Sequence, residues 1–314
     1  MKNKKNICLI FFLLISCMEL QAQNTKRVVI LALDGMSVNG YHQASTPVMD
    51  ALMDEGALSL KTRVVNPSIT LPNWTSRLTG SGPEQHGVVD NSWTVDSRAL
   101  LPLVEDAQGY YPSVFKILRE NVNDVKIGFY YEWASLINSL NPKYMDEIKQ
   151  IDKTETSHSE LGAMVYEFIE KNQSNPTVVF YINDDVDGKG HGYGWKSEEY
   201  YKAIETADKN FGVLIAKMKE AGLYESTYFF ILSDHGGVNT GHGGVTLDEM
   251  NVPWGIKGPG IAEGLEITDA NNTVNTATTI LNIFDIKQPQ EWIGQTIECI
   301  YSKRVPKTQS KPRK

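Results

Sequence analysis

The chain has 314 residues, of which 41% are hydrophobic and 22% are charged, and its formal net charge is −8. This is the composition of a globular protein that can bury a core, and the length suits one large α/β domain or two smaller ones. The acidic balance argues against a nucleic-acid polymer as the partner.

The N-terminus has the pattern of an export signal. Three lysines precede an apolar run over 7–15, which is too short to form a stable membrane-spanning helix. We expect 1–22 to be a signal peptide cleaved after Ala22, so that the mature protein is periplasmic or secreted. The alternative is a bacterial lipobox at 14–17, in which Cys17 carries lipid. Only this second form of processing would give the protein a membrane as a partner.

The C-terminal segment 301–314 contains six basic residues, no acidic residue and two prolines. We predict a solvated, disordered tail there rather than a binding patch. The chain between the two ends, 23–300, shows no internal repeat and no linker that would divide it. A single domain is therefore expected over this range.

The first central strand is predicted over 26–33, a β-branched apolar run that ends at Asp34. A carboxylate at the end of a buried strand is costly unless it is paired or coordinated, although an Asp-Gly turn is the alternative. A helix follows over 46–53 with Gly56 as its stop, and then a strand around 61–65.

A helix start is predicted beside Thr70, because Pro72 suits the first turn of a helix. At this place the helix macrodipole favours an alkoxide or a bound phosphoryl oxygen. A simple N-cap role for Thr70 is the alternative, and the two interpretations are compatible.

The periodicity downstream predicts helices and strands in alternation, as in an α/β fold. The predicted helices span 112–122, 157–171, 198–221 and 276–284, and the predicted strands span 125–130, 177–182 and 228–232.

Carboxylate and imidazole side chains follow the strands at 177–182 and 228–232. They are Asp187 and His191 after the first, and Asp234, His235 and His242 after the second. Open α/β sheets build their sites at the carboxyl ends of the strands, and this donor set suits zinc and similar divalent ions. An acidic calcium-type loop is the alternative for 184–192, but it would need more oxygen ligands and no imidazole.

Several motifs together resemble the nucleotide pyrophosphatase/phosphodiesterase branch of the alkaline phosphatase superfamily. They are Thr-Leu-Pro-Asn at 70–73, Leu-Thr-Gly at 78–80, Pro-Glu-Gln-His-Gly at 83–87 leading to Asn91, the Asp-x-x-Gly-His pattern at 187–191, and the Asp234-His235 stretch. Leu71 stands where phenylalanine is usual in that family.

This resemblance implies a three-layer α/β/α fold with a mainly parallel central sheet, and a catalytic domain over 23–300. It also implies two divalent metal ions, with zinc the expected metal. The implied ligands are Asp187, His191 and His242 for one metal and Asp34, Asp234 and His235 for the other, with Thr70 coordinated and acting as nucleophile, Asn91 binding the phosphoryl group and Trp133 contacting substrate.

The implied activity is hydrolysis of a small phosphodiester or pyrophosphate, with no protein partner. Metal coordination would activate the Thr70 hydroxyl, which is a poor nucleophile at neutral pH. Glu132 and Trp133 stand where monoesterases of the superfamily often place lysine and arginine, which favours a diester; core packing is the alternative for Trp133. Only six residues separate His235 from His242, where the nucleotide branch usually has a long insertion, so nucleotide specificity stays open.

Three other functions remain as alternatives. The first two are a phosphomonoesterase and a phosphonate hydrolase of the same superfamily. The third is a secreted protein that keeps the metal site without turnover.

Overall fold

The computed structural model describes residues 25–152 and 158–302. The predicted signal peptide 1–22, Cys17 with its lipobox, and all but the first two residues of the predicted tail 301–314 lie outside the described residues. Within the described ranges, no helix is long and apolar enough to cross a membrane.

The described chain is built around one eight-stranded sheet with the strand order β4-β3-β5-β1-β6-β7-β2-β8. The strands are β1 (Arg27–Leu33), β2 (Gly56–Arg63), β3 (Lys126–Tyr131), β4 (Glu147–Gln150), β5 (Thr177–Asn183), β6 (Thr227–Ser233), β7 (Asn251–Lys257) and β8 (Leu265–Glu266). The five strands from β4 to β6 are mutually parallel, whereas β7 runs antiparallel to both β6 and β2. The predicted mainly parallel sheet is confirmed.

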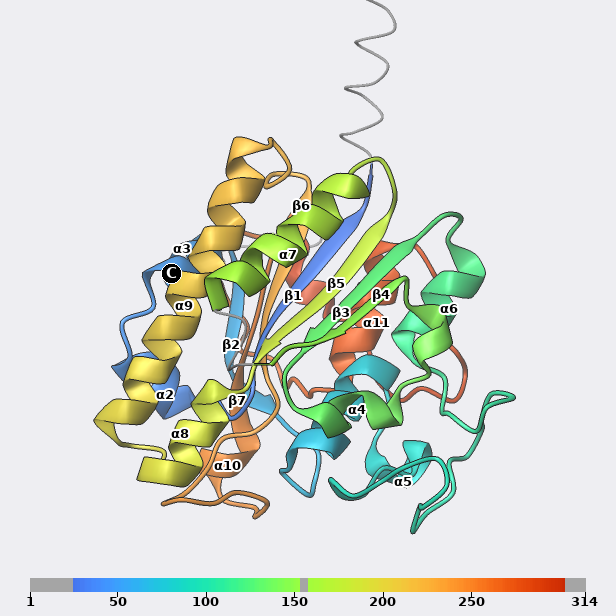
Figure 1. Cartoon of the computed structure of the whole chain (residues 1–314), viewed down its shortest axis with the longest axis horizontal. Coiled ribbons are helices and arrows are strands. Elements are labelled where there is room, and N and C mark those ends of the chain that lie inside the picture. The colour runs from blue at the N-terminus through green and yellow to red at the C-terminus, as the bar shows by residue number, and fades with distance from the viewer. Residues whose placement is uncertain (1–24, 153–157, 303–314) are drawn as a thin grey trace, which may run out of the picture.

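Helices cover both faces of the sheet and complete the predicted three layers (Figure 1). The α-helices are α2 (Val38–Gln43), α3 (Pro47–Asp54), α4 (Thr70–Thr79), α5 (Pro83–His86), α6 (Val114–Asn121), α7 (His158–Lys171), α8 (Asp185–Tyr193), α9 (Glu198–Glu220), α10 (Leu247–Met250) and α11 (Asn275–Ile283). Helices α7 and α9 pack on one face, and α4, α6 and α11 on the other.

Strand β1 lies at the centre of this arrangement and is buried along its whole length. Its side chains alternate between two cores, as the period of two of a strand requires. Val28, Ile30 and Ala32 pack in the core under α4 and α11, and Val29, Leu31 and Leu33 pack in the core under α7 and α9. A strand buried on both faces explains why its sequence is continuously apolar.

Helix α3 ends at Asp54, shortly before Gly56, so the predicted helix stop is confirmed, and the same glycine opens β2. A Cβ at Gly56 would lie 2.3 Å from the carbonyl oxygen of Ile256 on β7, so this close pairing of β2 with β7 requires glycine. The calcium-type loop considered for 184–192 is instead α8, a helix begun by Asp184. Gly190 in this helix packs so closely on Trp195 that a Cβ would lie 2.7 Å from the indole.

The order β5-β1-β6 determines where the functional side chains meet. Leu33, at the end of β1, is in register with Asn183 at the end of β5 and with Ser233 at the end of β6. The residues that follow these three strands therefore emerge side by side at one edge of the sheet. The predicted ligands lie in these segments, as expected for the carboxyl ends of parallel strands.

Candidate active site

Asp34, Asp234 and His235 form a buried cluster, called here the inner triad. Asp34 follows β1 and the other two residues follow β6. Potential ligand atoms of the three residues all lie within 4.8 Å of one another. The Nε2 atom of His235 is 3.4 Å from both Asp34 Oδ1 and Asp234 Oδ2. This arrangement agrees with the predicted grouping of these residues around one metal.

Asp187, His191 and His242 form a second cluster, the outer triad, which is partly exposed. Asp187 and His191 lie four residues apart on α8 and so share one face of that helix. The Nε2 atom of His191 is 3.5 Å from Asp187 Oδ2 and 3.2 Å from His242 Nε2. The two triads are adjacent, because Asp187 Oδ1 lies 3.9 Å from His235 Nε2.

Each of the three imidazoles is oriented by a backbone carbonyl. The Nδ1 atoms of His235, His191 and His242 lie 2.9, 2.9 and 3.0 Å from the carbonyl oxygens of Gly236, Thr240 and Ser68, respectively. When the neutral ring carries its proton on Nδ1, Nδ1 donates a hydrogen bond to the carbonyl oxygen. The electron pair on Nε2 is then directed into the site and is available to a metal. Metal-binding histidines are usually held in this way.

The electrostatics of the inner triad fit a divalent cation. Asp34 Oδ1 and Asp234 Oδ2 are buried without a hydrogen-bond partner in the described part of the chain. Burial and the neighbouring Asp34 carboxylate raise the pKa of Asp234 well above its usual value. Burial lowers the pKa of His235, but the carboxylates of Asp234 and Asp34 outweigh it and raise that pKa to about 10. A bound cation would relieve the repulsion between the two carboxylates, and the two oxygens without a hydrogen-bond partner would coordinate it.

Thr70 is the first residue of α4, with Ile69 as the N-cap. The prediction that Thr70 lies at a helix N-terminus is confirmed, and the alternative that it is the N-cap itself is wrong. Its side chain is buried, with Oγ1 3.3 Å from His235 Nε2. The hydroxyl therefore lies against the inner triad, where the helix macrodipole favours a negative oxygen.

Asn91 is held in a defined orientation beside Thr70. Its Oδ1 atom accepts a hydrogen bond of 2.8 Å from the backbone N–H of Leu71, the second residue of α4. Because the carbonyl end of the side-chain amide is used in this way, the Nδ2 donor remains for another group. Asn91 also lines the pocket in front of both triads.

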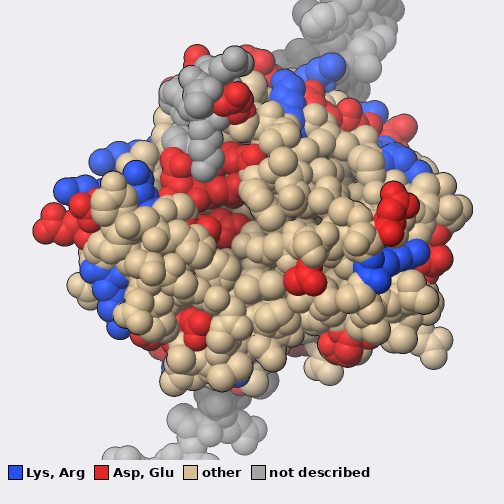
Figure 2. Space-filling model, turned by 60° about the horizontal axis from the view of Figure 1, so that its bottom comes forward, with Lys and Arg blue, Asp and Glu red and all other residues tan. Residues whose placement is uncertain are grey.

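That pocket has a volume of about 410 Å³. Its lining residues are Asp34, Thr70, Asn91, Glu132, Trp133, Asp184, Asp187, Gly188, His191 and His242. Figure 2, which brings the active-site edge of the sheet forward, shows acidic side chains gathered in a hollow. The structure thus brings Trp133 to the same cavity as the predicted ligands, while its ring also packs against the core.

Glu132 and Asp184 connect the ends of two neighbouring strands at the pocket wall. Glu132 Oε2 accepts a hydrogen bond of 2.8 Å from the Asp184 N–H, and Asp184 Oδ2 accepts one of 2.6 Å from the Trp133 N–H. This pair of hydrogen bonds was not predicted from the sequence. The only sequence feature that pointed to it is that an acidic residue follows each of the two strands.

Another residue absent from the predicted site is Trp74, whose indole Nε1 donates to Asp34 Oδ2 at 3.2 Å. The available signal was its spacing, since Trp74 stands one helical turn after Thr70.

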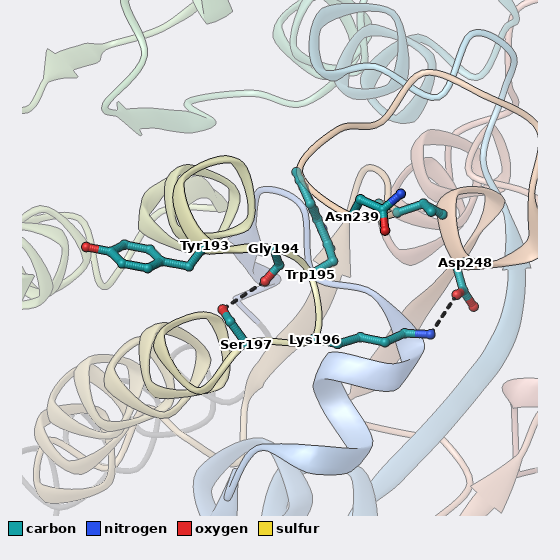
Figure 3. Close-up of a pocket in the computed structure, with 9 residues that line it drawn as sticks. Tyr193, Gly194, Trp195, Lys196, Ser197, Asn239 and Asp248 are labelled. Atoms are coloured by element: carbon teal, nitrogen blue, oxygen red, sulfur yellow. Dashed lines mark hydrogen bonds and ion pairs between the residues drawn. The ribbon is translucent and has the colours of Figure 1, made fainter.

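A second cavity, of about 270 Å³, lies beside the site and is shown in Figure 3. Its wall includes Trp195 and the ion pair between Lys196 and Asp248, whose charged atoms are 3.0 Å apart. The Trp195 ring lies 5.1 Å from the His191 ring and 5.7 Å from the His242 ring. No member of either triad lines this second cavity. The predicted ligands open onto the first pocket, which Thr70 also lines.

The family model described as type I phosphodiesterase / nucleotide pyrophosphatase matches residues 28–277. The chain belongs to this family. The matched range begins in β1 and ends in α11, so it includes both triads, Thr70 and Asn91. The predicted relationship to this branch of the alkaline phosphatase superfamily is confirmed.

Relatives with curated descriptions are distant and longer. Human ectonucleotide pyrophosphatase/phosphodiesterase family member 1 is 24% identical over 218 residues, which are 68% of this chain and 24% of the human protein. The Caenorhabditis elegans ectonucleotide pyrophosphatase/phosphodiesterase C27A7.1 is 24% identical over 269 residues, 82% of this chain and 31% of the worm protein. A bis(5'-adenosyl)-triphosphatase of Xenopus laevis is 22% identical and is covered over 47% of its length.

Solved structures of related proteins have the same fold. Murine ectonucleotide pyrophosphatase/phosphodiesterase 5 superposes with a TM-score of 0.73 at 13% identity, covering 88% of this chain and 100% of the murine one. An inactive variant of that murine protein in complex with AMP gives a TM-score of 0.71, covering 85% and 96% of the two chains. At these identities the likeness shows the fold alone, and the roles of individual residues here remain predictions.

Proposed function

We propose that this protein is a metal-dependent phosphodiesterase of the nucleotide pyrophosphatase type, with Thr70 as nucleophile and two divalent metal ions, of which zinc fits best. The observation that carries the proposal is the position of the Thr70 hydroxyl. It lies at a helix N-terminus, 3.3 Å from His235 and beside two adjacent Asp/His triads. Together these features are suited to phosphoryl transfer to a hydroxyl.

The two triads provide the ligands. Asp34, Asp234 and His235 would hold one ion and Asp187, His191 and His242 the other. When bound, the ions lower the pKa of the Thr70 hydroxyl and stabilise the attacking and leaving oxygens of an in-line displacement.

The residues of the chain then perform the remaining steps. Thr70 Oγ1 gives up its proton to solvent and attacks phosphorus, which forms a phosphothreonine and breaks the bond to the leaving group. The leaving oxygen takes up a proton from solvent as the alcohol, or departs as the ionised phosphate of a nucleotide. The Nδ2 atom of Asn91 donates to a non-bridging phosphoryl oxygen, a role for which its carbonyl end is already fixed on Leu71. Water hydrolyses the phosphothreonine and restores Thr70, while Trp133 contacts the second ester substituent.

The substrate is a small phosphodiester or pyrophosphate. Related proteins are described as nucleotide pyrophosphatases, and one of them binds AMP. The short interval between His235 and His242 leaves phosphodiesters of lipid headgroups, sugars or linkers as substrates alongside nucleotides. Glu132 on the pocket wall disfavours the phosphomonoesterase alternative, because a carboxylate repels a dianion more than a monoanion.

The decisive experiment is hydrolysis of bis-p-nitrophenyl phosphate and of a nucleotide p-nitrophenyl ester by the purified protein, with metal content measured on the same samples. We expect turnover of at least one diester that disappears on chelation and returns with zinc. A protein that holds metal but hydrolyses neither diester would support the metal-binding alternative and contradict the proposed activity.

We also propose that the protein is exported, as expected from the signal at 1–22. The relatives are named ectonucleotide pyrophosphatase/phosphodiesterases, and the prefix ecto- in that name supports this proposal. N-terminal sequencing of the mature protein distinguishes the two forms of processing. A chain that begins at Gln23 supports simple secretion, whereas a blocked, lipidated Cys17 supports a membrane anchor.

A further inference from the structure

Helix α4 presents three side chains to the inner triad from successive turns. Thr70, Trp74 and Arg77 occupy positions i, i+4 and i+7, which lie on one face of an α-helix. All three side chains are buried. The proposed function gives a role only to Thr70, although Trp74 contacts Asp34 after β1 and Arg77 contacts Ser233 at the end of β6.

Trp74 determines which oxygen of Asp34 faces the site. Its indole Nε1 donates to Asp34 Oδ2 at 3.2 Å, while Oδ1 lies 3.4 Å from His235 Nε2. The indole itself is held edge-on against Phe180 of β5, with ring centroids 5.3 Å apart and 85° between the planes. The hydrogen-bond donor therefore has a fixed place in the core, and the carboxylate is oriented by it.

Arg77 fixes the end of β6 directly before Asp234. Its guanidinium donates to the carbonyl oxygen of Ser233 and, at 3.4 Å, to Thr276 Oγ1. The guanidinium carbon lies 5.6 Å from the Trp74 ring, so the two side chains support each other.

The charge of Arg77 is unusual in its surroundings. The side chain is 0% exposed, and within residues 25–152 and 158–302 no carboxylate forms an ion pair with it. Burial lowers the pKa of Arg77 to about 9, and the charge of Asp234 acts in the opposite direction. A buried cation is costly unless nearby negative charge compensates it, and the inner triad is the neighbouring source of such charge.

We propose that Trp74 and Arg77 are positioning residues for the inner metal site: Trp74 orients the Asp34 carboxylate, and Arg77 fixes the end of β6 directly before Asp234. This inference rests on one part of the proposed function, that Asp34, Asp234 and His235 bind a divalent metal. If Trp74 and Arg77 served only the core, their substitution would lower the stability of the fold without acting on one particular metal.

The test measures zinc affinity by competition with a chromophoric chelator, in a His191→Ala background in which the inner triad alone is complete. Trp74→Phe removes the indole donor and keeps most of the ring volume. We expect it to weaken zinc binding by about 10- to 100-fold, as for other hydrogen-bond partners of metal ligands. Trp292→Phe is the matched control, because Trp292 is also buried but its Nε1 has no hydrogen-bond partner among the described residues.

Arg77 is tested with two further variants in the same background. Arg77→Lys keeps a positive charge but loses the planar fork that reaches both Ser233 and Thr276, and Arg77→Met loses charge and donors together. We expect both to weaken zinc binding, because neither variant can hold the Ser233 carbonyl and Thr276 together as the guanidinium does. Thermal unfolding of the zinc-free proteins shows which variants are folded. If Arg77→Met does not fold, Trp74→Phe and Arg77→Lys still test both residues.

The outcomes separate this inference from the proposed function. Unchanged zinc affinity in folded Trp74→Phe and Arg77→Lys overturns the inference and leaves the proposed function in place. An equal loss in Trp292→Phe also overturns it, because core packing would then be the cause. If the His191→Ala chain with no other change binds no zinc, the proposed metal site fails and the inference fails with it.

Discussion

His235 and His242 stack face to face, with ring centroids 3.7 Å apart and 12° between the ring planes. His235 belongs to the inner triad and His242 to the outer triad, so the two candidate metal sites are in contact through these two stacked imidazole rings. Sites that clamp an in-line displacement hold two metals about 3.5–4 Å apart. The stacking places the two ligand sets side by side.

Two metal ions per chain are expected in the active protein. The six Asp and His ligands divide into two sets of three, each within coordinating range. Elemental analysis of wild-type protein should give about two zinc ions per chain, and His235→Ala or His242→Ala should each remove one. One metal or none per active wild-type chain would contradict the two-metal proposal.

The two metals should differ in how fast they leave. The side chains of Asp34, Asp234 and His235 are 5%, 0% and 0% exposed, whereas His191 of the outer triad is 47% exposed. A chelator reaches the outer site first, so metal release followed with a chromophoric chelator should show a fast and a slow phase. His191→Ala should remove the fast phase only. A single phase for both metals would refute this asymmetry.

Thr70→Ala should abolish turnover without emptying the metal sites. The hydroxyl is the proposed nucleophile, while six other side chains are the proposed metal ligands, so we expect kcat to fall on the order of 10⁴-fold or more. Thr70→Ser, which keeps a hydroxyl, is the matched variant and should retain measurable activity. Metal content is measured in both. Near wild-type turnover in Thr70→Ala would show that another group attacks.

Asn91→Ala should lower kcat by about 10²- to 10³-fold, the usual effect of losing one donor to a developing oxyanion. Asn91 accepts from the Leu71 N–H, and its Nδ2 is the group proposed to bind the phosphoryl oxygen. Metal content serves as the control and should not change, because Asn91 is not among the proposed metal ligands. A loss confined to KM would mean that the contact is equally strong in the bound substrate and the transition state.

Diesters should be preferred over monoesters. Two zinc ions with the carboxylates of Asp34, Asp187 and Asp234 leave a charge of about +1, and Glu132 adds a negative charge at the pocket wall. The measurement compares kcat/KM for bis-p-nitrophenyl phosphate with that for p-nitrophenyl phosphate.

Glu132→Gln is the informative variant for this preference. Its amide oxygen can still accept from the Asp184 N–H while the charge is gone. It should raise monoester hydrolysis relative to diester hydrolysis. A wild-type enzyme that prefers the monoester would overturn the diesterase assignment and leave the metal site in place.

The local features of this protein were predictable from its sequence. Apolar runs that end abruptly in acids predicted the strand that precedes Asp34 and the strand that precedes Asp234. Pro72 predicted that Thr70 stands at the start of a helix, and the helix 198–221 agrees with α9 (Glu198–Glu220). These signals depend on periodicity and turn chemistry within about ten residues, which is why they can be recognised in the sequence alone.

Only the tertiary structure decided which strand ends lie next to one another. The order β5-β1-β6 brings Asp34, Asp187 and Asp234 together, and the antiparallel β7 places Ile256 so close to Gly56 that this position requires glycine. The hydrogen bond from Trp74 to Asp34 joins residues 40 positions apart, and the one from Arg77 to Ser233 joins residues 156 apart. Such contacts depend on how two faces of one sheet are packed by helices from the whole chain, and no local pattern specifies that packing.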